Sequence, residues 1–251
     1  MILRRLGNKK KISGEIIKHF PDHKIYLEPF FGGGGMFFYK PKAKYNIVND
    51  LDSDVFNLFQ VVMNQKEELE AAFKIMPIHS DLLNYWKRNQ ETEPIKKALR
   101  FLFLSNLTFL GKHETLRFGT RNDKSSVSKY IESTFNLLKD VQFKNECFRT
   151  FFSGIEFREL QQTFIYADPP YLETGSNYQH SFTESDSNDL FDILESTEIK
   201  FAMSEFDHPF ILDQVEDRRL NIHIIGERQS LKNRRTEILI TNYDIKQMEL
   251  F

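Results

Sequence analysis

The chain has 251 residues, of which 40% are hydrophobic and 28% charged, and its formal net charge at pH 7 is −2. This composition can build the core of one sizeable domain with a smaller insert, and it excludes a bulk polycation. The single cysteine, Cys147, excludes a disulfide scaffold, a cysteine-rich zinc site and an iron–sulfur cluster. The sequence shows neither a signal peptide nor an apolar run long enough to span a membrane, so we expect a cytoplasmic protein without a membrane partner.

The spacing of apolar residues predicts an alternation of helices and strands. In chain order the expected elements are a helix (12–20), strands (25–27 and 46–50), a helix (55–62), interrupted helices (66–105, with breaks near Pro77 and Pro94), a helix (135–141), strands (148–152 and 163–167), a helix (186–195) and strands (200–203 and 237–241). Asp52 or Ser53 is expected to cap the helix over 55–62. Between about 105 and 130 the periodicity fails, which is typical of a functional loop. The alternation favours an α/β fold with a parallel sheet.

Four consecutive glycines, Gly32 to Gly35, follow the first predicted strand. They let the backbone turn sharply and approach a ligand, at the strand end where open α/β sheets bind ligands. The dinucleotide fingerprint and the P-loop ending are both absent. Asp50 ends the second strand at a position suited to gripping ribose hydroxyls. We therefore expect a ligand with a nucleoside but no pyrophosphate, and S-adenosylmethionine fits. A tight turn without a ligand is the alternative.

The sequence Asp168-Pro169-Pro170-Tyr171 follows the clearest predicted strand. The two prolines fix φ angles and remove backbone donors, so the carbonyls of Asp168 and Pro169 are rigid and not used by a sheet ladder. A carboxylate beside a rigid carbonyl forms a pair of acceptors that suits an NH₂ group. The Tyr171 ring is expected to stack on a planar base. A turn that only ends the strand is the alternative.

Residues 28–34, Asn49-Asp50 and Asp168-Pro169-Pro170-Tyr171, in this order, closely resemble the motifs of the Dam-type adenine-specific DNA methyltransferases. The resemblance runs nearly end to end, through an N-terminal motif (4–9), a segment that cradles the cofactor's adenine (152–157) and a closing strand (237–243). It implies a class I, Rossmann-like methyltransferase sheet with helices on both faces, plus a smaller, mostly helical DNA-recognition insert. The implied catalytic domain covers 1–62 and 145–251, and the insert covers 63–144.

The resemblance also implies site residues, a cofactor and a mechanism. The implied catalytic residues are Asp168, Pro169, Pro170 and Tyr171. The implied residues for S-adenosylmethionine are Arg5, Lys9, Glu28, Pro29, Phe30, Gly32, Gly33, Gly34, Asp50, Glu156, Phe157 and Asp168. The target adenine is flipped out of the duplex, and its amine donates to Asp168 and to the Pro169 carbonyl. Positioning is then the main contribution to in-line methyl transfer, and no metal is expected.

Basic residues fill the irregular middle of the chain and the N-terminal motif. We expect DNA contacts from Arg4, Lys112, Arg117, Arg121 and Lys124. Arginine pairs bidentately with guanine, so Arg117 and Arg121 are the candidates for reading bases, and the two lysines suit phosphates. The Gly-x-Phe-Asn-Val-Pro run of GATC-specific relatives is absent, which argues against GATC as the recognition sequence.

Several alternatives stay open at the level of sequence. They are an RNA adenine methyltransferase, a cytosine 4-amino methyltransferase and a non-catalytic DNA-binding relative. The long segment between the glycine loop and the Asp-Pro-Pro-Tyr motif favours double-stranded DNA as the partner, because it can supply a recognition region. We expect a monomer, with a restriction endonuclease acting separately as a partner. A regulatory or a phage role is equally compatible with the sequence.

Overall fold

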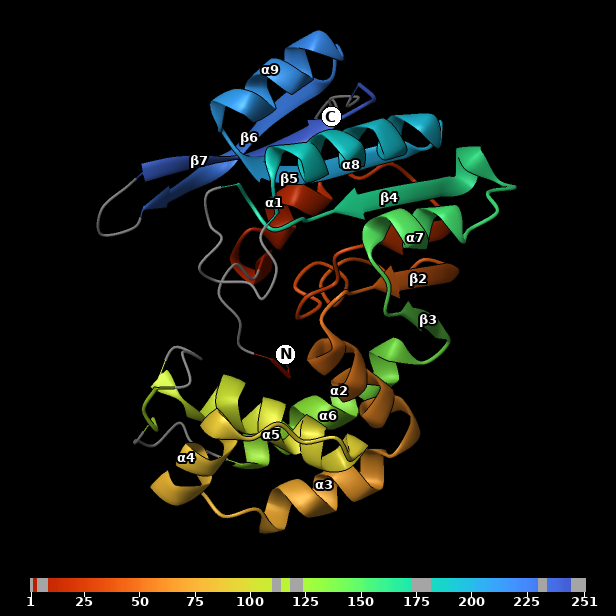
Figure 1. The fold of residues 1–251 in the computed structure, drawn as a ribbon. Coiled ribbons are helices and arrows are strands. Elements are labelled where there is room, and N and C mark those ends of the chain that lie inside the picture. Colours follow the sequence, from red (N-terminus) through yellow and green to blue (C-terminus); the bar gives the residue numbers. More distant parts are fainter. Residues whose placement is uncertain are drawn as a thin grey trace, which may run out of the picture.

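The computed structural model describes residues 2–3, 9–109, 114–117, 124–172, 182–229 and 234–244 (Figure 1). Its centre is a seven-stranded sheet with the order β3-β2-β1-β4-β5-β7-β6. The strands are β1 (Ile25–Glu28), β2 (Tyr45–Asn49), β3 (Val141–Lys144), β4 (Thr163–Ala167), β5 (Lys200–Phe206), β6 (Asn221–Gln229) and β7 (Arg234–Thr241). The first five are parallel to one another, and β7 runs antiparallel to both of its neighbours.

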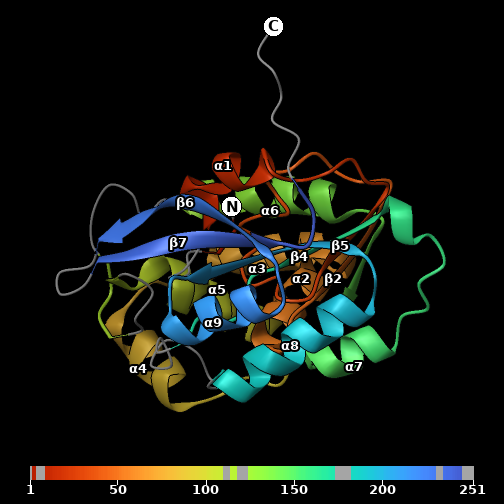
Figure 2. The same cartoon turned by 90° about the horizontal axis from the view of Figure 1, so that it is seen from above.

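Helices cover both faces of this sheet. They are α1 (Ser13–Ile17), α2 (Ser53–Asn64), α3 (Lys66–Ile75), α4 (Ser80–Arg88), α5 (Pro94–Leu107), α6 (Lys124–Leu138), α7 (Phe148–Ser153), α8 (Glu184–Ser196) and α9 (Pro209–Asp217), with short 3₁₀ turns at Lys9–Lys11 and Leu160–Gln162. Figure 2 shows α7, α8 and α9 along one face and α1 on the other. Helices α2 to α6 gather into a separate layer below the sheet in Figure 1. The α/β fold class expected from the sequence is confirmed.

Two hydrophobic cores lie on opposite faces of the sheet, because neighbouring strand residues point to opposite sides. Tyr26 belongs to the first core and Leu27 to the second, and Phe164 and Ile165 divide in the same way. The second core packs against α7, α8 and α9. The first core continues without interruption into the helical layer. The sheet is therefore buried on both faces, as parallel sheets usually are.

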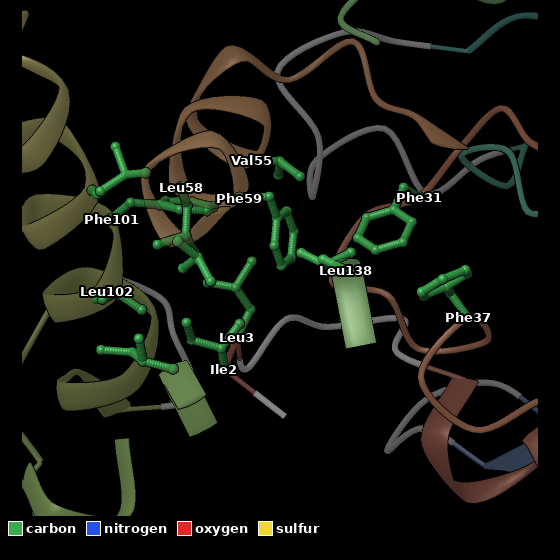
Figure 3. Packing of buried hydrophobic residues seen from close by; sticks show 14 of the residues in the cluster. Ile2, Leu3, Phe31, Phe37, Val55, Leu58, Phe59, Phe101, Leu102 and Leu138 are labelled. Carbon is green, nitrogen blue, oxygen red and sulfur yellow. The ribbon is translucent and has the colours of Figure 1, made fainter. Parts of the chain in front are cut away.

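The first core joins the helical layer to the glycine loop. In Figure 3, Leu58 and Phe59 of α2 lie between Phe101 of α5 and Phe31 of the glycine loop. Ile2 and the adjacent Leu3 are also fully buried in this core. The helical layer and the catalytic sheet therefore share one core. The expected end of the insert at 144 also needs a correction, because β3 pairs with β2 and belongs to the sheet.

Local capping explains several element boundaries. Asp52 caps α2, as expected, by accepting a hydrogen bond from the backbone N–H of Asp54 at 2.9 Å. Pro94 occupies the first turn of α5, where its missing N–H costs nothing, and Glu93 caps that helix. Pro77 lies between α3 and α4. The two breaks expected in 66–105 are therefore confirmed.

Other expectations were wrong. The segment 148–152 is helix α7 rather than a strand, because Phe148, Phe151 and Phe152 bury one helical face. The strand comes earlier, at β3, so Val141 belongs to a strand and not to the preceding helix. Helix α5 extends to Leu107 and α6 begins at Lys124, which shortens the irregular middle. The sequence analysis did not predict α9 or β6.

Candidate active site

The carboxyl ends of three neighbouring strands place the site. Strand β1 lies between β2 and β4 and runs parallel to both. Glu28 therefore ends at the same edge of the sheet as Asp50, just after β2, and Asp168, just after β4. This edge is where open α/β sheets bind their ligands. Residues that are more than a hundred positions apart in the sequence meet there.

The glycine loop is held against β2. The Gly32 N–H donates to Asp50 Oδ2 at 2.5 Å, and the Phe31 N–H donates to the Asn49 carbonyl at 2.8 Å. Gly32 and Gly34 have φ angles of +54° and +72°, in the left-handed region that favours glycine. A Cβ on Gly34 would lie 2.3 Å from the Phe38 ring, whereas a Cβ on Gly32 would meet nothing within 4 Å. Packing therefore requires Gly34, and open space adjoins Gly32.

Asn49 organises this edge, although the sequence analysis did not propose it as a site residue. Its buried Nδ2 donates to the Pro29 carbonyl at 3.0 Å and to the Glu146 carbonyl at 2.9 Å. Its Oδ1 accepts from the Glu146 N–H at 3.0 Å. Asn49 thus joins the glycine loop to the segment after β3. The signal in the sequence was its place beside Asp50 at the strand end.

Asp168 lies in a network with a buried cation. The Lys9 ammonium is 2.8 Å from Asp168 Oδ1 and 2.9 Å from Glu237 Oε1. It also donates to the Tyr171 hydroxyl, which in turn donates to Glu237 Oε1 at 2.9 Å. Lys9 is therefore next to the candidate catalytic carboxylate. Glu237, on β7, was missing from the sequence-based candidates.

Tyr171 does not have the expected role of a stacking surface in this structure. Its side chain is buried, and its ring packs edge-on against Phe206 with centroids 4.7 Å apart. Burial raises the pKa of Tyr171 well above its ordinary value, so the phenol stays protonated and can donate to Glu237. The Tyr171 ring therefore packs inside the protein, next to the Lys9 ammonium that pairs with Asp168.

Burial also shifts the buried glutamates. Glu28 accepts from the Tyr26 hydroxyl at 2.8 Å, and burial, with smaller contributions from the Asp168 and Asp50 charges, raises its pKa to about 8. Burial likewise raises the pKa of Glu205, on β5, to about 8. At neutral pH both groups therefore hold a proton. Glu28 and Glu205 therefore add little negative charge to this edge near pH 7.

Three aromatic rings lie around the glycine loop. The centroids of Phe30 and Phe148 are 5.7 Å apart, and each lies 6.0 Å from that of Phe182. Phe30 and Phe182 are only half-buried. This arrangement brings planar, apolar surface to the loop and to the start of α7.

Glu156 and Phe157, which the resemblance implies for the cofactor, lie on the segment between α7 and β4. They precede β4 and so lie toward the amino ends of the strands. Glu156 is exposed and pairs with Arg158 at 2.9 Å, while Phe157 packs against the second core. Helix α7 carries the chain away from the site before these residues. Glu146, directly after β3, occupies the site edge instead.

Only part of the expected DNA surface can be placed. Arg4, Arg5, Lys112 and Arg121 lie outside the described residues. The Arg117 N–H donates to the Leu107 carbonyl at 2.8 Å, next to the bridge between Thr108 and Leu116. Lys124 donates to the Lys74 carbonyl at 3.1 Å and to the Met76 carbonyl, at the end of α3. Its ammonium therefore caps a helix in this structure.

Within the described ranges, no group of three or more histidine, cysteine, aspartate or glutamate side chains is arranged to hold a metal ion. In that same part of the chain, none of the helices has the length and apolarity needed to cross a membrane.

The fold and the site define an α/β protein whose strand ends carry a glycine loop bound to Asp50 and an ion-pair network around Asp168. The family model of the D12 class N6 adenine-specific DNA methyltransferases matches residues 6–231, and the chain belongs to this family. The resemblance seen in the sequence is thereby confirmed, as is the enzyme class of DNA adenine methyltransferases.

Curated relatives agree with this assignment. The chain is 23% identical to a DNA adenine methylase of Escherichia coli, over 92% of this chain and 88% of that protein. It is 25% identical to the type II methyltransferase M1.LlaDCHI of Lactococcus lactis subsp. cremoris, over 94% and 93% of the two chains. It is also 23% identical to the modification methylase StsI of Streptococcus sanguinis, over 99% of this chain but 43% of that longer protein.

Proposed function

We propose that this DNA adenine methyltransferase transfers a methyl group from S-adenosylmethionine to the exocyclic amine of an adenine flipped out of double-stranded DNA. The observation that carries the proposal is the shared sheet edge, where the glycine loop with Asp50 adjoins Asp168. One side of this edge suits a nucleoside, and the other suits an NH₂ group. The family assignment supports the target base.

The described residues fit the cofactor. Open space adjoins Gly32, so a ligand can approach the backbone there. A carboxylate offers about four acceptor positions, so Asp50 can hold the loop and accept from ribose hydroxyls together. Phe30, which is half-buried next to the loop, offers a ring surface to an adenine. When bound, the cofactor supplies an activated methyl group on a sulfonium. The roles of Arg5, Glu156 and Phe157 toward it are not part of this proposal.

The chain's own residues act mainly by positioning. Asp168 accepts one hydrogen of the target amine, and the rigid Pro169 carbonyl accepts the other. This orients the nitrogen lone pair toward the methyl donor and excludes rotation of the amine. The geometry converts the transfer into an effectively intramolecular step, which can lower the barrier by up to about 7–11 kcal/mol. After transfer, the amine nitrogen loses one proton, and Asp168 is the adjacent acceptor.

The helical layer is the proposed DNA-recognition region. It carries Arg117 beside the end of α5, and it contains the segment where Lys112 and Arg121 fall in the sequence. Names of relatives such as a modification methylase support a restriction–modification role with a separately acting endonuclease. We also propose that the protein is a monomer.

Methyl transfer to defined duplexes tests the proposal. Isotope-labelled S-adenosylmethionine is incubated with duplex DNA and with structured RNA, and the methylated base is identified by mass spectrometry. N6-methyladenine in DNA is the expected product. Label in RNA alone, or on cytosine alone, would remove the proposed substrate.

A further inference from the structure

Glu237 is a buried acid in the middle of the candidate active site. It lies on β7 opposite Phe206 of β5, and its side chain is about 2% exposed. Its Oε1 is 2.9 Å from the Lys9 ammonium and accepts from the Tyr171 hydroxyl at 2.9 Å. A buried carboxylate is costly unless it is paired and hydrogen-bonded. Glu237 therefore needs both partners, and both partners also serve the Asp168 corner.

Lys9 connects Glu237 to Asp168. Its side chain is 3% exposed, and both carboxylates lie within hydrogen-bond distance of its one nitrogen. Asp168 is 22% exposed and is thus the acid of this trio that reaches solvent. One buried cation is therefore shared between a candidate catalytic carboxylate and an interior carboxylate that no substrate reaches.

We propose that Glu237 is a positioning residue for methyl transfer, which anchors Lys9 and Tyr171 so that Asp168 stays ionised and oriented toward the target amine. The proposal rests on the function proposed above. Without Glu237, Lys9 would pair with Asp168 alone and compete with the amine for its oxygens. Without Lys9, two neighbouring carboxylates would repel each other, and the pair would take up a proton.

Other groups face the same corner from the surrounding elements. Among the described residues they are Tyr26 and Glu28 of β1, Tyr166 of β4, Tyr171 after it and Glu205 of β5. The tyrosines and the two glutamates are neutral near pH 7, because burial raises the pKa of each of them. The groups that ion pairs join directly at this corner are Asp168, Lys9 and Glu237. The balance of charge at the corner therefore depends on these three residues.

Single-turnover methylation rates, measured from pH 5 to 8.5, test the proposal in four proteins. They are the wild type, Glu237→Gln, Lys9→Met and the double variant. Glu237→Gln should lower the rate roughly 10- to 100-fold, the effect of losing one hydrogen bond to a charged group, with cofactor affinity essentially unchanged. Lys9→Met should move the acidic limb of the profile to higher pH. The double variant should move that limb back and exceed Lys9→Met in rate at neutral pH.

Glu205→Gln is the matched control, because Glu205 is also a buried acid of this sheet but already holds its proton at neutral pH. It should leave the profile below pH 7 unchanged. The neutral double variant leaves no unpaired buried charge at positions 9 and 237, so it should fold even if a single variant does not. Thermal unfolding and cofactor binding verify that each protein is folded.

The outcomes separate the two proposals. If Lys9→Met and the double variant show the same rate and the same acidic limb, the role of Glu237 is overturned. A wild-type rate for Glu237→Gln would also overturn it. If instead the folded, cofactor-binding wild type forms no N6-methyladenine in duplex DNA, the proposed function itself fails.

Discussion

Asp168 occupies the point where the sheet edge, the buried cation and the target amine meet. Asp168→Ala removes one of the two acceptors that hold the amine, so methyl transfer should fall to background. Asp50 and the glycine loop are untouched, so most cofactor binding should survive. Calorimetric titration with the cofactor, alongside methyl transfer, measures both effects. Pro169→Ala is a useful companion, because it keeps the carbonyl but removes the fixed φ angle. Near-wild-type turnover by Asp168→Ala would refute the assignment.

Replacing Asp50 should affect cofactor binding more than the rate of methyl transfer. Its carboxylate holds the Gly32 N–H and is placed for ribose hydroxyls. A hydrogen bond to a charged group contributes about 1.5–3 kcal/mol, so Asp50→Ala should weaken cofactor binding roughly 10- to 100-fold. The rate at saturating cofactor should change much less. Asp52→Ala is the control, because Asp52 caps α2 and should affect only stability. An unchanged dissociation constant for Asp50→Ala would remove this residue from the site.

Gly34 tests the packing of the loop. Alanine at this position combines a positive φ with a Cβ 2.3 Å from the Phe38 ring, so Gly34→Ala should destabilise the fold by roughly 1–3 kcal/mol. Gly14, in α1, has open space around its Cβ position, and Gly14→Ala should be neutral or stabilising by up to about 1 kcal/mol. Urea denaturation of the two variants measures the difference. Equal stabilities would mean that the loop rearranges freely.

At the scale of elements, Lys124 and Arg117 separate a structural role from recognition. Lys124 lies at the carboxyl end of α3, where a cation stabilises a helix by about 0.3–1 kcal/mol, so Lys124→Ala should lower stability by that amount. Arg117→Ala should instead weaken discrimination between cognate and near-cognate sites by roughly 1–3 kcal/mol. Methylation of a randomised duplex pool and the salt dependence of binding measure both. If Lys124→Ala also flattens the salt dependence by about one charge, Lys124 contacts a phosphate as well.

Elements with a strong local signal were predictable from sequence. Strand β4 is a continuous buried run ahead of Asp168, and the glycine loop follows β1 directly. Helix α7 was misread because Phe-Arg-Thr-Phe-Phe suits a strand by composition, while its burial follows the helical spacing of Phe148, Phe151 and Phe152. Edge strand β6 was missed although Asn221 to Ile224 alternate polar and apolar residues, and its isoleucines Ile222 and Ile224 lie on the exposed side of the strand and not in a core.

At the scale of the whole molecule, the buried glutamates predict how stability depends on pH. Glu28 and Glu205 have pKa values of about 8 in the fold, against an ordinary value of 4.5. Between these values each of the two glutamates holds a proton in the folded chain but not in the unfolded chain, so their contribution to the free energy of unfolding should fall as pH rises from 4.5 to 8. Burial lowers the pKa values of His19, His23 and His223, so these histidines contribute in the opposite direction around their ordinary pKa of 6.5. Denaturation at pH 5.5 and pH 8 measures the difference. Glu205→Gln should reduce it, and the exposed substitution Glu68→Gln should not. A pH dependence of stability that Glu205→Gln leaves unchanged would contradict the assignment.

The network around Asp168 could not be predicted from the sequence, because it forms only once the strands have assembled into the sheet. Lys9, Asp168 and Glu237 are brought together only when η1 (Lys9–Lys11), β4 and β7 pack around one edge. The motifs identified Asp168 and Asp50, since each ends a strand whose neighbours were also predictable. Glu237 lies inside a strand, where an acid has no local signal for a partner. Its burial and its two contacts are tertiary facts.

The most direct test of the account is the identity of the methylated base. Purified wild type and Asp168→Asn are each incubated with labelled S-adenosylmethionine and duplex DNA, and the nucleosides are separated by mass spectrometry. The account predicts N6-methyladenine with the wild type and none with Asp168→Asn, at similar cofactor affinity. No methylated adenine from a folded, cofactor-binding wild type on a randomised duplex pool, or equal product from both proteins, would contradict it.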